Sequence, residues 1–190
     1  MRAFISIDLP PALFTPVFKE RIFGDRCTRV ATDFHLTLLF LPNITEEKAR
    51  GLWNTMDEIA GDISPFKATI KGAGAFNRRG RPGVLWFGFA DGGITVKMHS
   101  DLMSKASELG IETAAESFEP HITLARFRCT PAMPSLHAFL ERYRDVALGE
   151  QHVDHLHFKQ SELLSGGARH TVLHTSVLRG TSSPCSTDPV

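Results

Sequence analysis

Two short stretches of the chain each place a threonine two residues after a histidine: His35 with Thr37, and His121 with Thr123. Large apolar residues occupy the positions between and around them. Successive side chains of a β-strand point to opposite faces, so each histidine would share a face with its threonine, and the apolar residues would share the other. The pattern therefore predicts two strands. Each would have one buried apolar face and an opposite face that carries an imidazole and a hydroxyl.

Two histidines that face one site can divide acid and base work between them. The imidazole pKa of about 6.5 allows both protonation states near neutral pH, so one ring can accept a proton while the other donates one. Each role typically contributes about 10²–10⁴ in rate. The threonine hydroxyls would hold the oxygens of a tetrahedral anion between the rings, most naturally phosphate. This chemistry requires neither a metal nor a cofactor, because the leaving oxygen is protonated as it departs.

Other kinds of catalytic site find less support. The chain has no H-E-x-x-H or C-x-x-C ligand pair, no G-x-S-x-G nucleophile motif, no P-loop and no G-x-G-x-x-G. The other histidine cluster is His152, His155 and His157, of which the last two would share a strand face. A metal there is conceivable, but partly exposed or structural histidines are the favoured interpretation.

The repetition is what gives the two motifs weight, because a single histidine on a strand is usually a half-buried polar residue. His170 and His174 serve as internal controls, since each is followed directly by a threonine. Adjacent residues point to opposite faces of a strand, so neither of these pairs can present its imidazole and its hydroxyl on the same face.

Composition sets the class of protein. The 190 residues are 42% hydrophobic and 22% charged, as in an ordinary soluble globular protein. The 21 basic residues balance 21 acidic ones, so strong sequence-independent binding to duplex nucleic acid is not expected. No signal peptide is evident, and no stretch approaches the ~20 apolar residues that span a bilayer. Cys27, Cys129 and Cys185 are far apart in sequence and are expected to be free thiols in a reducing cytosol, which predicts a cytoplasmic protein without a membrane partner.

The elements that must position the motifs follow from periodicity. Strands are predicted at about 2–7, 34–40, 66–70, 84–89, 121–127, 153–163 and 170–178. Helices are predicted at about 14–22, 45–60, 94–109 and 136–143, with Thr45 capping the second and Gly110 ending the third. The glycine-rich segment 72–82 is interpreted as a loop, and residues 181–190 as a disordered tail.

Strands and helices are mixed without strict alternation, and they group into two units that each contain one histidine strand. We therefore predict an α+β fold with antiparallel sheets and two pseudo-symmetric halves, folded as a single bilobal domain over residues 1–180.

At this point the two motifs resemble those of the 2H phosphoesterase superfamily, and most closely those of the RNA 2′,3′-cyclic phosphodiesterases, also called 2′-5′ RNA ligases. The likeness extends over most of residues 2–180. The segments that carry it are 2–10, 34–41, 72–86, 120–126 and 161–178. Two positions depart from the family pattern: Pro42 stands where Gly is usual, and His170 where Tyr is common.

The resemblance implies a V-shaped cleft between the halves and a defined reaction, the opening of a 2′,3′-cyclic phosphate at an RNA end to a 2′-phosphate. By the same resemblance His35 is the general acid that protonates the departing 3′ oxygen, and His121 is the general base that activates water. Thr37 and Thr123 would hold the non-bridging oxygens. The reverse reaction, with a 5′-hydroxyl as the attacking group, would give weak 2′-5′ ligation.

Basic residues near the motifs leave two interpretations open. Arg126 lies five residues after His121, so strict alternation puts it on the opposite face, and a bulge is needed before it can contact substrate phosphate. It is either a substrate contact or a surface residue. Arg78, Arg79 and Arg81 either meet the RNA backbone or belong to a solvated loop.

Three functions are carried forward. The leading one is a monomeric enzyme acting on cyclic phosphate ends of RNA. The second keeps the chemistry but takes a small nucleotide-type cyclic phosphate as substrate. The third is a module that binds a nucleotide or RNA without turnover.

Overall fold

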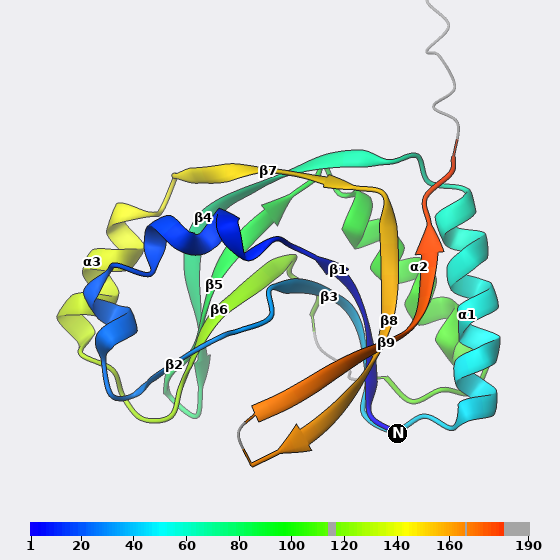
Figure 1. Ribbon diagram of the computed structural model, residues 1–190, viewed down its shortest axis with the longest axis horizontal. Helices are drawn as coiled ribbons and strands as arrows, with labels where there is room; N and C mark the ends of the chain where they lie inside the picture. The colour runs from blue at the N-terminus through cyan, green and yellow to red at the C-terminus, as the bar shows by residue number, and fades with distance from the viewer. Residues whose placement is uncertain (114–116, 166, 181–190) are drawn as a thin grey trace, which may run out of the picture.

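The computed structural model describes residues 1–113, 117–165 and 167–180 (Figure 1). The strands are β1 (Ala3–Asp8), β2 (Thr28–Val30), β3 (His35–Leu41), β4 (Phe66–Arg78), β5 (Arg81–Ala90), β6 (His121–Phe127), β7 (Ala147–Val153), β8 (His155–Leu164) and β9 (Gly167–Val177). The helices are the 3-10 helices η1 (Pro11–Val17) and η2 (Arg21–Gly24) and the α-helices α1 (Glu46–Gly61), α2 (Ile94–Glu108) and α3 (Met133–Arg142).

One antiparallel sheet runs through the whole molecule in the order β7-β4-β5-β6-β3-β1-β8-β9, and β2 pairs with the end of β6. The order divides into two sets of four strands, and each set ends at the centre with one histidine strand. The two sets meet at β6 and β3, through the single residue pair Leu36–Ile122. The predicted α+β class with two antiparallel halves is confirmed.

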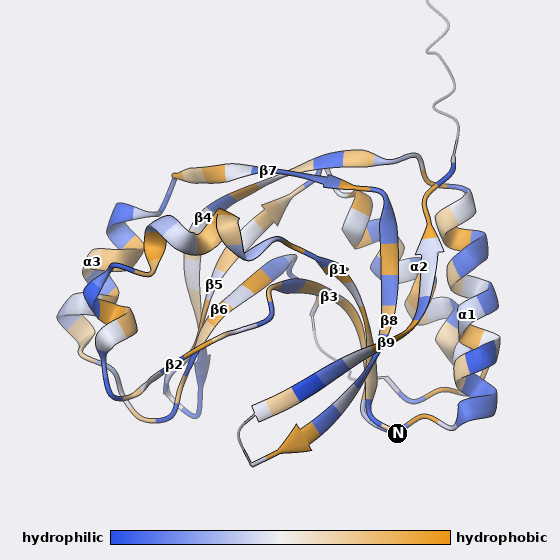
Figure 2. Cartoon of the chain, viewed as in Figure 1, coloured by the Kyte–Doolittle hydropathy of each residue, from blue (hydrophilic) through white to orange (hydrophobic). Residues whose placement is uncertain are grey.

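The helices cover each half separately. Helix α1 packs against β8 and β9, and α2 packs against α1 and β3, whereas α3 packs against β4 and η2 (Figure 1). As predicted, Thr45 caps α1, its Oγ1 accepting a hydrogen bond from the Lys48 amide at 3.3 Å. Beneath the sheet one apolar core joins both halves. Figure 2 shows the matching alternation of hydrophobic and hydrophilic residues along the strands.

The turn of the β8–β9 hairpin reaches the other half of the molecule. A Cβ atom on Gly167 would lie 2.4 Å from a guanidinium nitrogen of Arg29, so β2 packs against this turn. Leu163 and Leu164 are exposed just before it, at the end of β8. The hairpin therefore adds a contact between the halves to those of the β3–β6 seam and the common core.

Two predicted elements differ from the structure. The helix over 14–22 is wrong, because the segment forms two short 3-10 helices in which Phe14 and Ile22 are buried and Pro16 lacks an amide hydrogen. The loop over 72–82 is wrong as well, because β4 and β5 continue through it as a hairpin that turns at Arg79 and Gly80, both with positive φ. Strands β2 and β7 were not predicted as separate elements.

The glycines that suggested a loop have a packing role instead. A Cβ atom on Gly74 would lie 2.1 Å from the Trp86 ring, so the indole packs directly on this part of β4. A Cβ atom on Gly88 would lie 2.7 Å from the Lys71 carbonyl oxygen, which would force β4 and β5 apart. These glycines allow close approach within a sheet rather than a turn.

Cys27 and Cys129 form a disulfide, so the prediction of free thiols is wrong for both. Cys27 precedes β2 and Cys129 follows β6, and the antiparallel pairing of these strands brings the two ends together. The argument from thiols to a reducing cytosol therefore loses its basis. Cys185 and the predicted disordered tail, 181–190, lie outside the described residues. Among the residues that the structure describes, no helix combines the length and apolar character needed to cross a membrane.

Replacing Cys27 and Cys129 together by serine is expected to lower the free energy of unfolding by about 2–4 kcal/mol, because the bond closes a loop of 102 residues in the unfolded chain. Denaturant titration of both proteins, with and without reductant, measures the difference. In unreduced, denatured wild-type protein, thiol titration should find one reactive cysteine. Finding all three cysteines reactive would contradict the bond.

Candidate active site

Both histidine strands carry a β-bulge at the same place. The pairing of β3 with β1 skips Leu38, and the pairing of β6 with β5 skips Leu124, each the third residue after its histidine. The extra residue reverses the alternation, so that two consecutive residues are buried and the next one returns to the histidine face. Phe40 in β3 and Arg126 in β6 reach that face in this way. The bulge that Arg126 requires is therefore present.

The register between β3 and β6 brings the two motifs together on one face. With Leu36 opposite Ile122, position 123 comes opposite position 35, and position 121 opposite position 37. His35, Thr37, His121 and Thr123 are all half-buried, whereas the residues between them are fully buried. Diagonal neighbours in an antiparallel pair are about 7–8 Å apart at Cα, which places the two imidazoles across one small area of sheet.

The ring of His121 is held in its neutral form. Its Nδ1 lies 2.7 Å from the Glu119 carbonyl oxygen. A carbonyl only accepts, so Nδ1 carries the hydrogen and Nε2 keeps its lone pair. Burial lowers the pKa of His121, and the nearby charges of Arg126 and His35 act in the same direction, although the Glu119 carbonyl opposes them. The imidazole is therefore unprotonated near neutral pH.

Aromatic rings form the wall beside His121. Phe76 meets its ring edge to face at a centroid distance of 4.8 Å, and Trp86 lies 6.1 Å away. Both side chains are half-buried on the site face rather than in the core. Their position is set by the close packing of β4 on β5 at Gly74. A flat aromatic surface of this kind can stack a nucleic-acid base.

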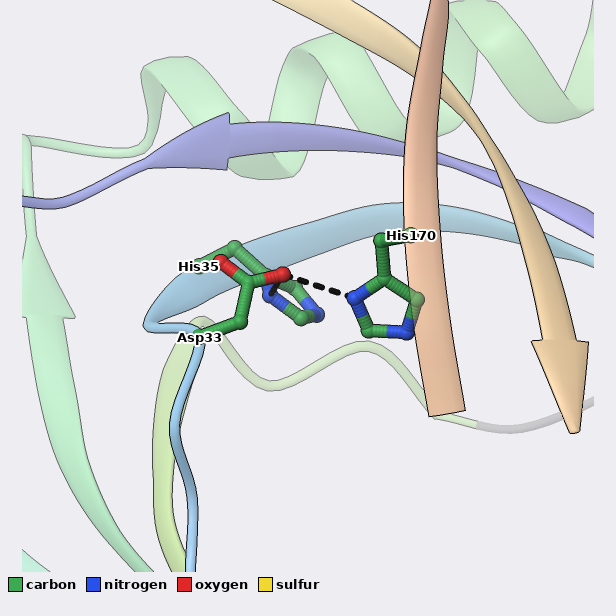
Figure 3. Close-up of side chains that lie close together, drawn as sticks. All are labelled: Asp33, His35 and His170. Carbon is green, nitrogen blue, oxygen red and sulfur yellow. Dashed lines mark hydrogen bonds and ion pairs between the residues drawn. The ribbon is translucent and has the colours of Figure 1, made fainter. Parts of the chain in front are cut away.

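His35 lies in a different environment, beside a carboxylate (Figure 3). Its Nδ1 is 3.4 Å from Oδ2 of Asp33, and the same oxygen lies 2.6 Å from Nδ1 of His170. The imidazole of His35, followed by His170 and Lys159, holds the pKa of Asp33 well below its usual range, against the opposing effect of burial. The carboxylate between the two rings is therefore ionised at neutral pH.

A buried ammonium group completes this side of the site. Lys159 of β8 is only 5% exposed, and its Nζ lies 2.7 Å from the carboxylate of Asp8 and 3.8 Å from that of Asp33. His157, also on β8, has Nε2 3.8 Å from Asp8. A buried charge requires such partners, so Lys159 fixes both carboxylates relative to β3. His155 and His157 share a face as predicted, with ring centroids 4.6 Å apart.

Three arginines gather near the other end of the motifs. Burial, with the charges of Arg2 and Arg78, lowers the pKa of Arg126, which remains a cation at neutral pH. Arg2 lies 4.7 Å over the ring of Phe40. Arg81, in contrast, donates a hydrogen bond to the Arg128 carbonyl oxygen at 3.1 Å. This side chain therefore connects the start of β5 to the residue that follows β6.

The structure brings both motifs to one face, as alternation predicted, and adds partners that sequence reasoning missed. Asp33 stands two residues before His35, and alternation alone would have put it on the same side. His170 was treated as a control and as a departure from the family pattern, not as a site residue, yet its ring lies 5.4 Å from that of His35. Lys159 and Asp8 carried no signal in the sequence, because only the β1–β8 pairing brings them to the site.

Comparison with known proteins identifies the family. The family model of the 2′-5′ RNA ligase superfamily matches residues 22–162. A protein of Thermus thermophilus named RNA 2′,3′-cyclic phosphodiesterase is 33% identical over 95% of this chain and 91% of its own length. A protein of the same name from Archaeoglobus fulgidus is 28% identical over 88% of this chain and 94% of its own.

Solved structures agree with this assignment. A crystal structure of a Thermus thermophilus protein superposes with a TM-score of 0.79 at 30% identity, covering 96% of this chain and all of that one. The fold is also that of E. coli LigT, solved with 3′-AMP, at a TM-score of 0.73 and 24% identity over 93% of this chain and 97% of that one. The chain belongs to the 2′-5′ RNA ligase superfamily, and the resemblance drawn from the two motifs is confirmed.

The pKa of His121 is expected to lie below the ordinary histidine value and to rise toward it in Phe76→Ala, because removing the ring admits water to the imidazole. An NMR titration of the imidazole resonances measures both values. Phe40→Ala removes a ring of equal size from the other half and should leave the His121 titration unchanged. An elevated His121 pKa in the wild-type protein would contradict the assignment of a neutral base.

Proposed function

We propose that this protein is a 2′,3′-cyclic phosphodiesterase that acts on RNA ends and opens the cyclic phosphate to a 2′-phosphate without a metal ion. The observation that carries the proposal is that two His–Thr pairs share one sheet face, and that one imidazole is held neutral while the other lies against a carboxylate. Relatives that share the family carry the name RNA 2′,3′-cyclic phosphodiesterase, which supports the same substrate class.

His121 acts as the general base. Its Nε2 lone pair is free, because Nδ1 is engaged by the Glu119 carbonyl. It takes a proton from a water molecule as the water oxygen forms a bond to phosphorus. The lowered pKa keeps the ring in the accepting form through the neutral range.

His35 acts as the general acid. The Asp33 carboxylate lies 3.4 Å from its Nδ1. A proton passes from the imidazolium form of His35 to the 3′ oxygen as the bond between that oxygen and phosphorus breaks. The products are a 3′-hydroxyl and a 2′-phosphate, and both rings return to their starting states by exchanging protons with solvent. When a 5′-hydroxyl attacks the cyclic phosphate in place of water, His121 takes its proton and His35 protonates the departing 3′ oxygen, which forms a 2′-5′ phosphodiester and gives weak 2′-5′ ligation.

Thr37 and Thr123 hold the non-bridging oxygens, and Arg126 balances the negative charge that grows on them. All three lie on the histidine face, two by alternation and Arg126 by the bulge. Hydrogen bonds to developing charge in a partly dehydrated site are the largest contribution that such groups make. Both motifs come from one chain, so the site is complete in a monomer.

Replacing His35 or His121 by alanine is expected to lower kcat for a 2′,3′-cyclic-phosphate-ended RNA by about 10²–10⁴-fold, because each removes one proton-transfer step. The double variant should lose little more, since the two groups act as a unit. His137→Ala, which changes an exposed histidine on α3, is the matched control. Phosphorus NMR of the product identifies the 2′-phosphate, and EDTA should leave the rate unchanged.

Several outcomes of that experiment would reject the proposal. Turnover at the wild-type rate by His121→Ala would show that His121 is not the general base. A 3′-phosphate product would show that the 2′ oxygen, and not the 3′ oxygen, is the leaving group. Binding of RNA without turnover would favour a binding module. A preference for a cyclic mononucleotide over longer RNA would favour the small-nucleotide enzyme.

Asp33→Asn is expected to lower kcat for a 2′,3′-cyclic-phosphate-ended RNA, because His35 loses the charged carboxylate that lies 3.4 Å from its Nδ1. Steady-state kinetics of the variant and the wild-type protein measure the loss. Asp57→Asn is the control, since that carboxylate contacts His174 at 2.9 Å, away from the site, and it should keep the wild-type kcat. An unchanged kcat in Asp33→Asn would show that this carboxylate does not act on His35.

A further inference from the structure

Asp33, His35 and His170 bring three metal-ligating groups to one point (Figure 3). They come from two places in the chain: Asp33 directly precedes β3 and His35 begins it, whereas His170 lies on β9. One ligand atom from each lies within 4.8 Å of the others. The carboxylate stands between the two rings, with distances of 3.4 Å to His35 and 2.6 Å to His170.

The three side chains are held in place before any ligand arrives. Phe4 stacks on the ring of His35 at a centroid distance of 4.9 Å and meets the ring of His170 edge-on at 4.8 Å. The Nδ1 atom of His35 is buried and lacks a hydrogen-bond partner among the residues that the structure describes. A buried nitrogen without such a partner, aimed at a carboxylate, has a coordination position to offer.

We propose that Asp33, His35 and His170 form a binding site for a divalent transition-metal ion of the zinc type, and that occupation of this site inhibits the enzyme by engaging His35. Two imidazole nitrogens and one carboxylate oxygen suit Zn²⁺, Co²⁺, Ni²⁺ or Cu²⁺ better than Mg²⁺ or Ca²⁺, which prefer oxygen ligands. A water molecule would supply the fourth ligand of a tetrahedral ion.

One ligand separation already has the value expected for this ion class, and the other two lie within 4.8 Å. Zinc bonds to nitrogen and oxygen of about 2.0–2.2 Å place tetrahedral ligand atoms about 3.3–3.5 Å apart. The separation of His35 from Asp33 already has this value, at 3.4 Å. The contact of His170 with Asp33 is a hydrogen bond at 2.6 Å and would open by less than an ångström as the shared proton leaves.

Lys159 is the group that opposes a cation here, with Nζ 3.8 Å from Oδ2 of Asp33. Its charge is compensated by Asp8, whose carboxylate lies closer, at 2.7 Å. One carboxylate charge therefore remains available to the ion, and the local charge does not forbid binding.

The inhibitory effect rests on the proposed function, whereas the binding site does not. A metal ion on Nδ1 displaces the pairing with Asp33 and fixes the ring on the ion, so His35 no longer cycles between acid and conjugate base. The reaction itself requires no metal, and the ion acts only as an inhibitor.

Co²⁺ tests the binding directly, because its visible absorption bands report coordination independently of activity. Titration of the wild-type protein should produce these bands at one equivalent. His170→Tyr keeps a ring of similar size but removes the nitrogen ligand, and it should bind Co²⁺ at least about tenfold more weakly. His170→Gln provides a second variant if the tyrosine disturbs folding. His155→Ala, in the neighbouring histidine pair, should bind as the wild type does.

Zn²⁺ tests the inhibition. It should inhibit wild-type turnover reversibly, with recovery on adding EDTA, and the concentration for half-inhibition should rise at least about tenfold in His170→Tyr. Absence of cobalt bands, or equal binding by wild type and His170→Tyr, overturns the site. Binding without inhibition overturns the inhibitory role. If the protein turns over no cyclic phosphate at all, the proposed function fails while the cobalt titration still decides the site.

Discussion

The pairing of β3 with β6 is the constraint on which the rest of the site depends. A single opposed pair, Leu36 and Ile122, fixes the register between the two halves. Side chains alternate with a period of two, so a slip of one residue would turn one motif toward the core and separate it from the other. Both halves keep an apolar back, with Leu36 and Ile122 fully buried. Burial of these apolar faces of β3 and β6 keeps the histidine and threonine side chains together on the opposite face.

The halves are similar in architecture and different in electrostatics. Each supplies a strand with a histidine, a threonine and a bulge at the same position. The carbonyl of Glu119 and the ring of Phe76 then surround one imidazole, and Asp33 and His170 accompany the other. A symmetric scaffold thus places two identical side chains in different surroundings, as the proposed division into acid and base requires.

The pattern of residue types along the chain predicted those structural features that depend only on residues close together in sequence. Alternation over a few residues was enough to place His35, Thr37, His121 and Thr123, and the capping residue Thr45 marked the start of α1. The bulges, the buried Lys159 and the Cys27–Cys129 bond depend on pairing between distant strands, which periodicity does not report. The hairpin over 72–82 was misread because glycine serves turns and close packing alike, and only the position of Trp86 shows which applies.

The Cys27–Cys129 bond has a topological consequence for the site. It closes a covalent ring with a sequence separation of 102 residues, and both histidine motifs lie inside that ring. A proteolytic nick anywhere between the motifs, such as at the exposed tip of the β4–β5 hairpin, would leave the two strands in one molecule. The two halves that carry the histidine motifs are thus tethered twice, once through the peptide chain and once through the disulfide bond.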